Sequence, residues 1–130
     1  MSLVPKDLKY AKTHEWVRVE GDTATVGITD FAQSELSDVV FVELPAIGKK
    51  LARSDTMGTV EAVKAVSDIY APVSGEVVAV NDDLRTDPAI VNKEPYGRGW
   101  IVRVRLASEA DLNALLGPTD YEVLAAKSAH

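Results

Sequence analysis

The sequence predicts a mainly β fold, a sandwich or barrel of short strands with short helices, mostly near its C-terminal end. Short apolar runs, alternating or rich in β-branched residues, fill the first two-thirds of the chain between turns that contain Gly, Pro or Asp. Leucines at helical spacing follow after residue 107. A chain of 130 residues with 46% hydrophobic content forms one domain with its own core. Strand runs before a small helical end are typical of sandwiches and barrels.

The expected strands follow from these patterns in chain order. A Gly-Asp turn at residues 21–22 separates two runs, the second of which alternates regularly between apolar and polar positions. The Val-Val-Phe-Val run at residues 39–42 is apolar and β-branched enough for a buried strand. We expect strands at residues 15–20, 23–28, 38–44, 56–63, 67–70, 76–80 and 100–106.

Short helices are expected where capping residues precede apolar residues at helical spacing. Thr29 caps the first helix, and Ser108 with Asp111 resembles a capping box for a helix that carries three leucines. A Gly-Pro pair at residues 117–118 is expected to stop that helix. We expect helices at residues 31–36, 88–91, 108–116 and 121–126.

Lys64 stands alone between two strand-like runs. It is the single basic residue between Arg53 and Arg85, in a stretch with several acids: Asp55, Glu61, Asp68, Glu76, Asp82 and Asp83. A lysine at a hairpin tip is accessible to a modifying enzyme and is held in place by the strands behind it. Acylation would remove its charge and attach a tether, which raises the effective concentration of a carried group at partner active sites. An ordinary solvated surface lysine is the alternative that this pattern leaves open.

Charge and composition exclude several classes of function. The net charge of −6 and the lack of a Lys/Arg-rich run argue against nucleic acid or an anionic membrane as a partner. The chain has no cysteine, which excludes disulfides and thiol catalysis. Its N-terminus has neither a signal nor a transit pattern. We expect a soluble cytoplasmic monomer, and a mature mitochondrial protein would share these features.

An enzyme active site has little support in the sequence. A hydrolytic triad needs an activated nucleophile, a base and an orienting group, and the candidate histidine bases are limited to His14 and the terminal His130. Residues 97–99, Gly-Arg-Gly, lack the pattern of a phosphate-binding loop, and no His or Cys pair has metal-ligand spacing. A Schiff-base lysine must be desolvated, whereas a hairpin tip is solvated.

Residues 61–77, around Lys64, resemble the lipoyl-attachment region of the glycine cleavage system H proteins. The similarity runs through nearly the whole chain as separate motifs in the same order. Ala62 and Ser37 depart from the family pattern, which usually has Ser and Gly there. The chain is identified as a member of this lipoyl-carrier family. The matching motifs outside the attachment region are Thr13-His14-Glu15-Trp16, residues 26–33, residues 38–45, Leu84, Pro88, Val91-Asn92 and residues 95–100.

The resemblance implies a lipoyl/biotinyl-type barrel-sandwich hybrid, or hammerhead, as a single lipoyl-carrier domain over residues 1–130. Its core is expected at about residues 9–106, with residues 107–126 as helical decoration. A lipoate-attaching enzyme would join lipoate to Lys64 through an amide. Glycine decarboxylase (P protein) would load an aminomethyl group, aminomethyltransferase (T protein) would pass it to tetrahydrofolate, and dihydrolipoamide dehydrogenase (L protein) would reoxidise the dithiol. The chain itself would be a carrier and not an enzyme.

The resemblance also implies roles for residues near Lys64. Thr13, Glu15 and Asp68 are expected to line a cleft that shields the loaded arm from water. A hydroxyl and two carboxylates suit charge-assisted hydrogen bonds to its terminal ammonium. Glu61 and Ala62 are expected to contact the enzyme that attaches lipoate.

Three further positions have structural expectations. His14 is expected to be a structural or partner-contact residue and not a base. Trp16 and Trp100 are expected in the core. Ser37 raises the question of whether the turn before residue 38 needs a positive φ, which glycine adopts most readily.

Two alternative functions remain open. Biotin carriers share the fold and the displayed lysine, but they usually have Met on both sides, where this chain has Val63 and Ala65. Some H-like proteins act in lipoate relay to other acceptors, which the sequence does not separate from glycine cleavage.

Overall fold

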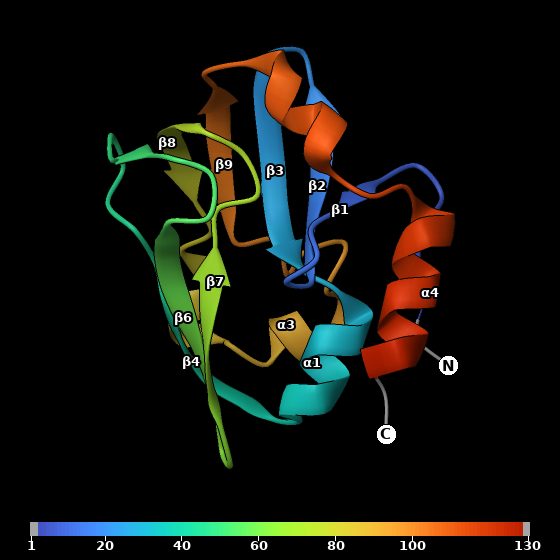
Figure 1. Ribbon diagram of the computed structural model, residues 1–130. Coiled ribbons are helices and arrows are strands. Elements are labelled where there is room, and N and C mark those ends of the chain that lie inside the picture. Colours follow the sequence, from blue (N-terminus) through green and yellow to red (C-terminus); the bar gives the residue numbers. More distant parts are fainter. Residues whose placement is uncertain (1–2, 129–130) are drawn as a thin grey trace.

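The structure is a computed structural model that describes residues 3–128 as two antiparallel sheets with short helices around them (Figure 1). The mainly β prediction is therefore confirmed. The larger sheet has the order β1-β2-β3-β9-β8-β5, formed by Lys9–Tyr10, Glu15–Glu20, Thr23–Ile28, Val102–Leu106, Gly75–Val80 and Lys50–Leu51. The smaller sheet has the order β4-β6-β7, formed by Val39–Glu43, Thr56–Ala62 and Val66–Tyr70. The helices are α1 (Asp30–Leu36), α2 (Asp83–Thr86), α3 (Ile90–Lys93), the 3₁₀ helix η1 (Glu109–Ala114) and α4 (Pro118–Ser128).

The main hydrophobic core lies between the two sheets. Val26, Val77 and Val104 of the larger sheet and Val60 and Ile69 of the smaller sheet are buried in one cluster. Burial of such side chains contributes about 1.5–3 kcal/mol each, which fixes the position of the smaller sheet. No helix within residues 3–128 is long and apolar enough to cross a membrane.

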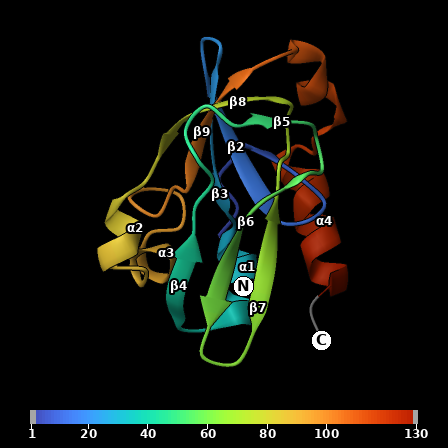
Figure 2. The same cartoon turned by 90° about the vertical axis from the view of Figure 1, so that its left-hand side faces the viewer.

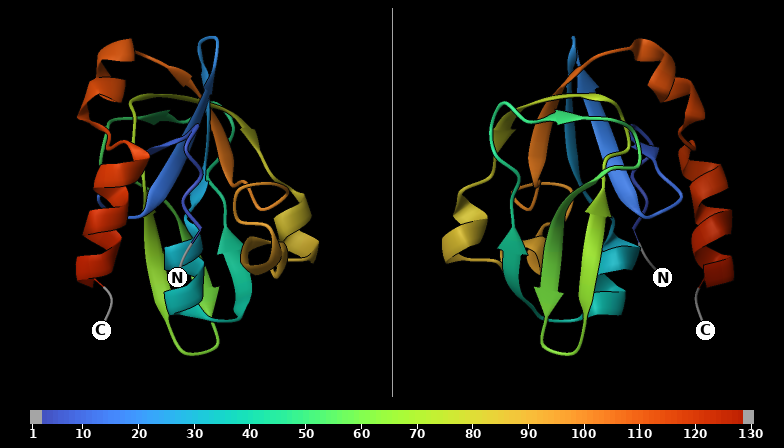
Figure 3. Two further views of the ribbon diagram at one scale, coloured as in Figure 1. Left: turned by 90° about the vertical axis from the view of Figure 1, so that its right-hand side faces the viewer. Right: turned by 60° about the vertical axis from the view of Figure 1, so that its left-hand side comes forward.

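A second buried cluster lies under α4. Tyr10, Trp16 and Tyr121 are fully buried there, and the rings of Tyr10 and Tyr121 stack with centroids 4.6 Å apart. Figure 3 shows η1 and α4 along one side of the fold, opposite α2 and α3. The C-terminal segment, expected as decoration, thus supplies a core aromatic.

The C-terminal helices differ from the expected ones. Ser108 caps a 3₁₀ helix by accepting from the Ala110 amide at 3.2 Å, while Asp111 accepts from the Ser74 amide at 2.7 Å. The prediction of a capping box is therefore wrong, because the Asp111 carboxylate binds the segment that precedes β8. Pro118 begins α4 and does not end a helix, as suits proline at a first helical position.

The strand β4 is only partly buried, which corrects the expectation for residues 39–42. Val39 pairs with Ala62 and Phe41 pairs with Glu61, so Val40 is an extra residue in a β-bulge. The bulge turns Val39 and Val42 inward and leaves Val40 and Phe41 exposed, at 51% and 50%. The strands β1 and β5 and the helix α2 were not expected from the sequence.

Candidate functional site

Lys64 lies at the tip of the β6–β7 hairpin, as its sequence context predicts. The hairpin projects beyond the rest of the fold at the bottom of Figures 1 and 2. Its connection has three residues, and the Ala62 amide donates to the Ala65 carbonyl at 2.7 Å across it. The Val63 amide donates to the Asp38 carbonyl at 3.2 Å, which ties the tip to the start of β4. Lys64 is exposed and makes no ion pair within residues 3–128.

Glu15 is a buried carboxyl group next to the same strand pair. It is only 1% exposed, and its oxygens accept from the Thr13 hydroxyl and, at 3.2 Å, from the Tyr70 amide. Burial raises the pKa of Glu15 to about 7, and these hydrogen bonds oppose that shift only in part. The contact joins the beginning of β2 to the end of β7, so the structure brings Thr13 and Glu15 together as expected.

A cleft of about 310 Å³ lies between this turn, α1 and β7. Its walls include the polar residues Thr13, Glu35 and Ser67, together with the apolar residues Phe31 and Leu36. Ser67 follows Lys64 by three residues, so the cleft begins about 10 Å along β7 from the tip at 3.3 Å per residue. A flexible group attached to Lys64 can therefore fold back into it.

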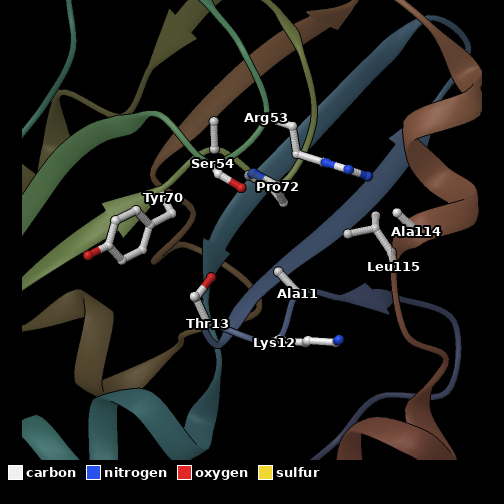
Figure 4. A pocket seen from close by; sticks show the side chains of 10 residues that line it. Ala11, Lys12, Thr13, Arg53, Ser54, Tyr70, Pro72, Ala114 and Leu115 are labelled. Carbon is white, nitrogen blue, oxygen red and sulfur yellow. The ribbon is translucent and has the colours of Figure 1, made fainter.

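A larger cavity of about 530 Å³ lies on the other side of Thr13. In Figure 4 the Tyr70 ring lies on one side of this cavity, and the side chains of Arg53 and Lys12 extend toward the opposite side, where Ala114 and Leu115 lie. Thr13 belongs to the walls of both the cavity and the cleft. The turn at residues 12–14 therefore separates two hollows beside Glu15.

His14 supports this turn from the inside. It has a positive φ of 74°, and its Nδ1 lies 2.7 Å from the hydroxyl of Tyr121, which also lies 2.6 Å from the Thr29 hydroxyl. Its ring packs on that of Phe31, with the ring centroids 4.8 Å apart. Burial lowers the pKa of His14. A neutral, hydrogen-bonded imidazole agrees with the structural role expected for His14.

Asp68 lies apart from Thr13 and Glu15. It pairs with Thr59 and is exposed on the outer face of the smaller sheet. Because successive side chains of a strand alternate between its two faces, its neighbours Ser67 and Ile69 lie on the inner face. Within residues 3–128, the walls of the cleft contain Ser67 and Glu35, and Asp68 is not among them.

The two tryptophans differ in burial. Trp16 is fully buried and donates from Nε1 to the Pro95 carbonyl at 2.8 Å, as expected for a core residue. Trp100 is half-buried, and the guanidinium of Arg103 lies 4.1 Å above its ring. The expectation of a core position is therefore met fully by Trp16 and only in part by Trp100.

Comparison with known proteins identifies the family. The family model described as glycine cleavage H-protein matches residues 8–128. The chain belongs to the glycine cleavage H-protein family. It is 58% identical to a glycine cleavage system H protein of Rubrobacter xylanophilus over 121 residues, which cover 93% of this chain and 94% of the relative. It is 54% identical to that of Carboxydothermus hydrogenoformans over 124 residues, 95% of each chain.

A solved structure agrees with the same family. The crystal structure of a glycine cleavage system H protein from Mycobacterium marinum matches with a TM-score of 0.85 at 37% identity. The match covers 92% of this chain and 97% of that chain. The expected barrel-sandwich hybrid fold is thereby confirmed.

Ser37 answers the question raised by its departure from the H-protein pattern. Its φ is 64°, so the turn does use a conformation that favours glycine. Asn92 holds this turn, donating from Nδ2 to the Ser37 carbonyl at 2.7 Å and accepting from the Val39 amide at 2.9 Å. These bonds keep the chain in place between α1 and β4 despite the strain.

Ala62, the other departure from the H-protein pattern, faces inward. It is 7% exposed and pairs with Val39, whereas its neighbour Glu61 is exposed. Of these two residues, only Glu61 offers its side chain to an approaching enzyme. The expectation that Ala62 contacts such an enzyme is therefore corrected by its burial.

Proposed function

We propose that this chain is the lipoyl-carrying shuttle of a glycine cleavage system, with lipoate joined to Lys64 through an amide. The observation that supports this proposal most is the exposed lysine at the tip of a hairpin whose strands are anchored in the core. Membership of the H-protein family supports lipoate as the group that Lys64 carries. When bound, the lipoyl group supplies a dithiolane that takes up and passes on the one-carbon unit. We call the Lys64 side chain with this group the arm.

The partners that follow from this role are four enzymes. A lipoate-attaching enzyme modifies Lys64, and glycine decarboxylase, aminomethyltransferase and dihydrolipoamide dehydrogenase use the arm in turn. The residues of the chain bind and orient the arm and carry out no step themselves. Tethering keeps the arm at a high effective concentration at each docked active site.

The cleft of Thr13, Glu35 and Ser67 is the place where the loaded arm rests, with Glu15 bonded to its wall residue Thr13 and Asp68 outside it on the other face of the smaller sheet. An ammonium at the end of the arm gains charge-assisted hydrogen bonds from hydroxyl and carboxylate oxygens. Glu15 has a pKa near 7, so a cation beside it favours its ionised form and drives release of its proton. The apolar walls exclude water from the labile end of the arm.

The test is reconstitution of glycine cleavage. Lipoylated protein, mixed with the P, T and L proteins, is expected to support release of carbon dioxide from glycine. Lys64→Arg should abolish this release, while the exposed control Lys93→Arg should leave it unchanged. Fully lipoylated wild-type protein that supports no release would instead favour lipoate relay.

A further inference from the structure

The outer face of the smaller sheet carries two exposed apolar side chains, Phe41 and Val66, on either side of Glu61 and close to Lys64. Phe41 pairs with Glu61, and Glu61 pairs with Val66, so these three side chains stand side by side across β4, β6 and β7. Phe41 and Val66 are 50% and 63% exposed. In Figure 2 this sheet faces the viewer, and no other element of residues 3–128 crosses in front of it.

Two more exposed apolar residues extend this row. Val40 reaches the surface because the bulge in β4 inserts it next to Phe41, and Val63 lies in the hairpin tip with 71% exposure. Bulges re-aim side chains and are common next to functional sites. Exposed apolar residues are ordinary when scattered, whereas a contiguous patch marks an interaction site. We call the patch of Val40, Phe41, Glu61, Val63 and Val66 the tip face.

Acidic groups surround the tip face. The next row of the sheet is Glu43, Thr59 and Asp68, and the Thr59 hydroxyl donates to Glu43 at 3.3 Å. Asp38 is exposed on the other side, at the start of β4. The strands β4, β6 and β7 contain no Lys or Arg, and acylation removes the charge of Lys64 between β6 and β7.

We propose that the tip face docks on the mouth of the enzyme active site that receives the arm. The fitting partner surface has apolar side chains opposite Phe41 and Val66, and Arg or Lys side chains opposite Glu61 and around the rim. Apolar contacts beside polar ones are the usual anatomy of an interface, and opposite charges steer the two surfaces together. This inference rests on the proposed function and adds to it which surface and which chemistry bring the arm to its partner.

The same charges argue against a second copy of the chain as the occupant. Two tip faces brought together would place Glu61, Glu43 and Asp68 of one chain near those of the other. Like charges placed opposite one another across an interface disfavour such a pairing. A cationic partner gains from the same groups.

The test uses lipoylated full-length protein with purified glycine decarboxylase. Phe41→Ser/Val66→Ser removes the two apolar side chains without touching the core, and the matched control Ile47→Ser/Val123→Ser alters two equally exposed residues elsewhere, at 65% and 51% exposure. Intact mass first confirms equal lipoylation. We expect the KM for the tip-face variant to rise about tenfold with kcat unchanged, and the control to match wild type.

Three results would overturn the proposal in distinguishable ways. An unchanged KM for the tip-face variant overturns the docking surface alone. Wild-type protein without turnover overturns the proposed function, and the docking proposal with it. A wild-type dimer in sedimentation that Phe41→Ser/Val66→Ser dissociates would show that the face pairs with itself.

Salt dependence tests the cationic rim separately. Screening should raise the wild-type KM as ionic strength increases. Glu43→Gln/Glu61→Gln should weaken that dependence, because it removes two of the acids that face the partner. A wild-type KM that does not respond to salt contradicts a charged rim.

Discussion

Replacement of Glu15 by Gln is expected to remove a pH-dependent loss of stability. The pKa of Glu15 is raised from 4.5 to about 7 by burial in the folded protein. Between these values the folded protein holds a proton that the unfolded chain has lost. The contribution of Glu15 to the free energy of unfolding therefore falls as the pH rises through this window, and it is constant at higher pH.

The size of this effect follows from the two pKa values. Each pKa unit between folded and unfolded states corresponds to about 1.4 kcal/mol, so the full loss is about 3 kcal/mol. Gln resembles the protonated carboxyl group, since its oxygen accepts from the Tyr70 amide and its NH₂ group donates to Thr13. Glu15→Gln should match wild type near pH 4.5 and be about 3 kcal/mol more stable near pH 8.

Urea unfolding of the unmodified protein at several pH values provides the measurement. The difference between wild type and variant isolates Glu15, because other titrating groups such as His14 contribute equally to both. Glu20→Gln, at the exposed end of the same strand, should show no such trend. If the difference in free energy of unfolding between Glu15→Gln and wild type stays constant within about 0.5 kcal/mol from pH 4.5 to 8, the raised pKa of Glu15 is refuted.

Three further substitutions, each measured by urea unfolding, test backbone strain, a close backbone contact and the hydrogen bonds that hold His14. Ser37→Gly should stabilise the protein by about 1 kcal/mol, because φ is 64° there, and a loss of stability would contradict strain. Gly75→Ala should destabilise it by about 2 kcal/mol or more, since a Cβ would lie 2.1 Å from the Arg105 carbonyl oxygen, and a neutral effect would disprove the close approach. Tyr121→Phe should cost about 1–3 kcal/mol, because His14 and Thr29 lose a buried partner, and wild-type stability would argue against that network.

The sheets and the hairpin were predictable because their signals are local. Alternation in residues 23–28 gives β3, and the single charged residue Lys64 between two strand-like runs marks the connection of β6 to β7. Thr29 also caps α1 as expected, accepting from the Ala32 amide at 3.2 Å. Each of these features depends on residues close together in the chain.

The surface around Lys64 was less predictable because it depends on pairing between distant residues. The run from Val39 to Val42 looks uniformly buried until the bulge opposite Ala62 decides which side chains face out. A one-residue shift of register moves side chains to the other face of a strand. No local signal marked Val40 and Phe41 as exposed.

The cleft was predictable only in part for a similar reason. Thr13 and Glu15 come from one short motif, and the structure joins them. Glu35 and Ser67 reach the cleft from α1 and β7, which lie far from that motif in the sequence. Alternation from the buried Ile69 was the one available signal, since it places Ser67 and not Asp68 on the inner face of β7.

Attachment of lipoate to Lys64, on which the proposed function rests, is tested by intact-mass analysis of the protein isolated from its own cell. We predict a mass increase of one lipoyl group that maps to the peptide containing Lys64 and is absent from Lys64→Arg. The control Lys49→Arg should retain the increase. A mass increase of one biotinyl group, or an unmodified chain under full lipoate supply, would contradict lipoate attachment.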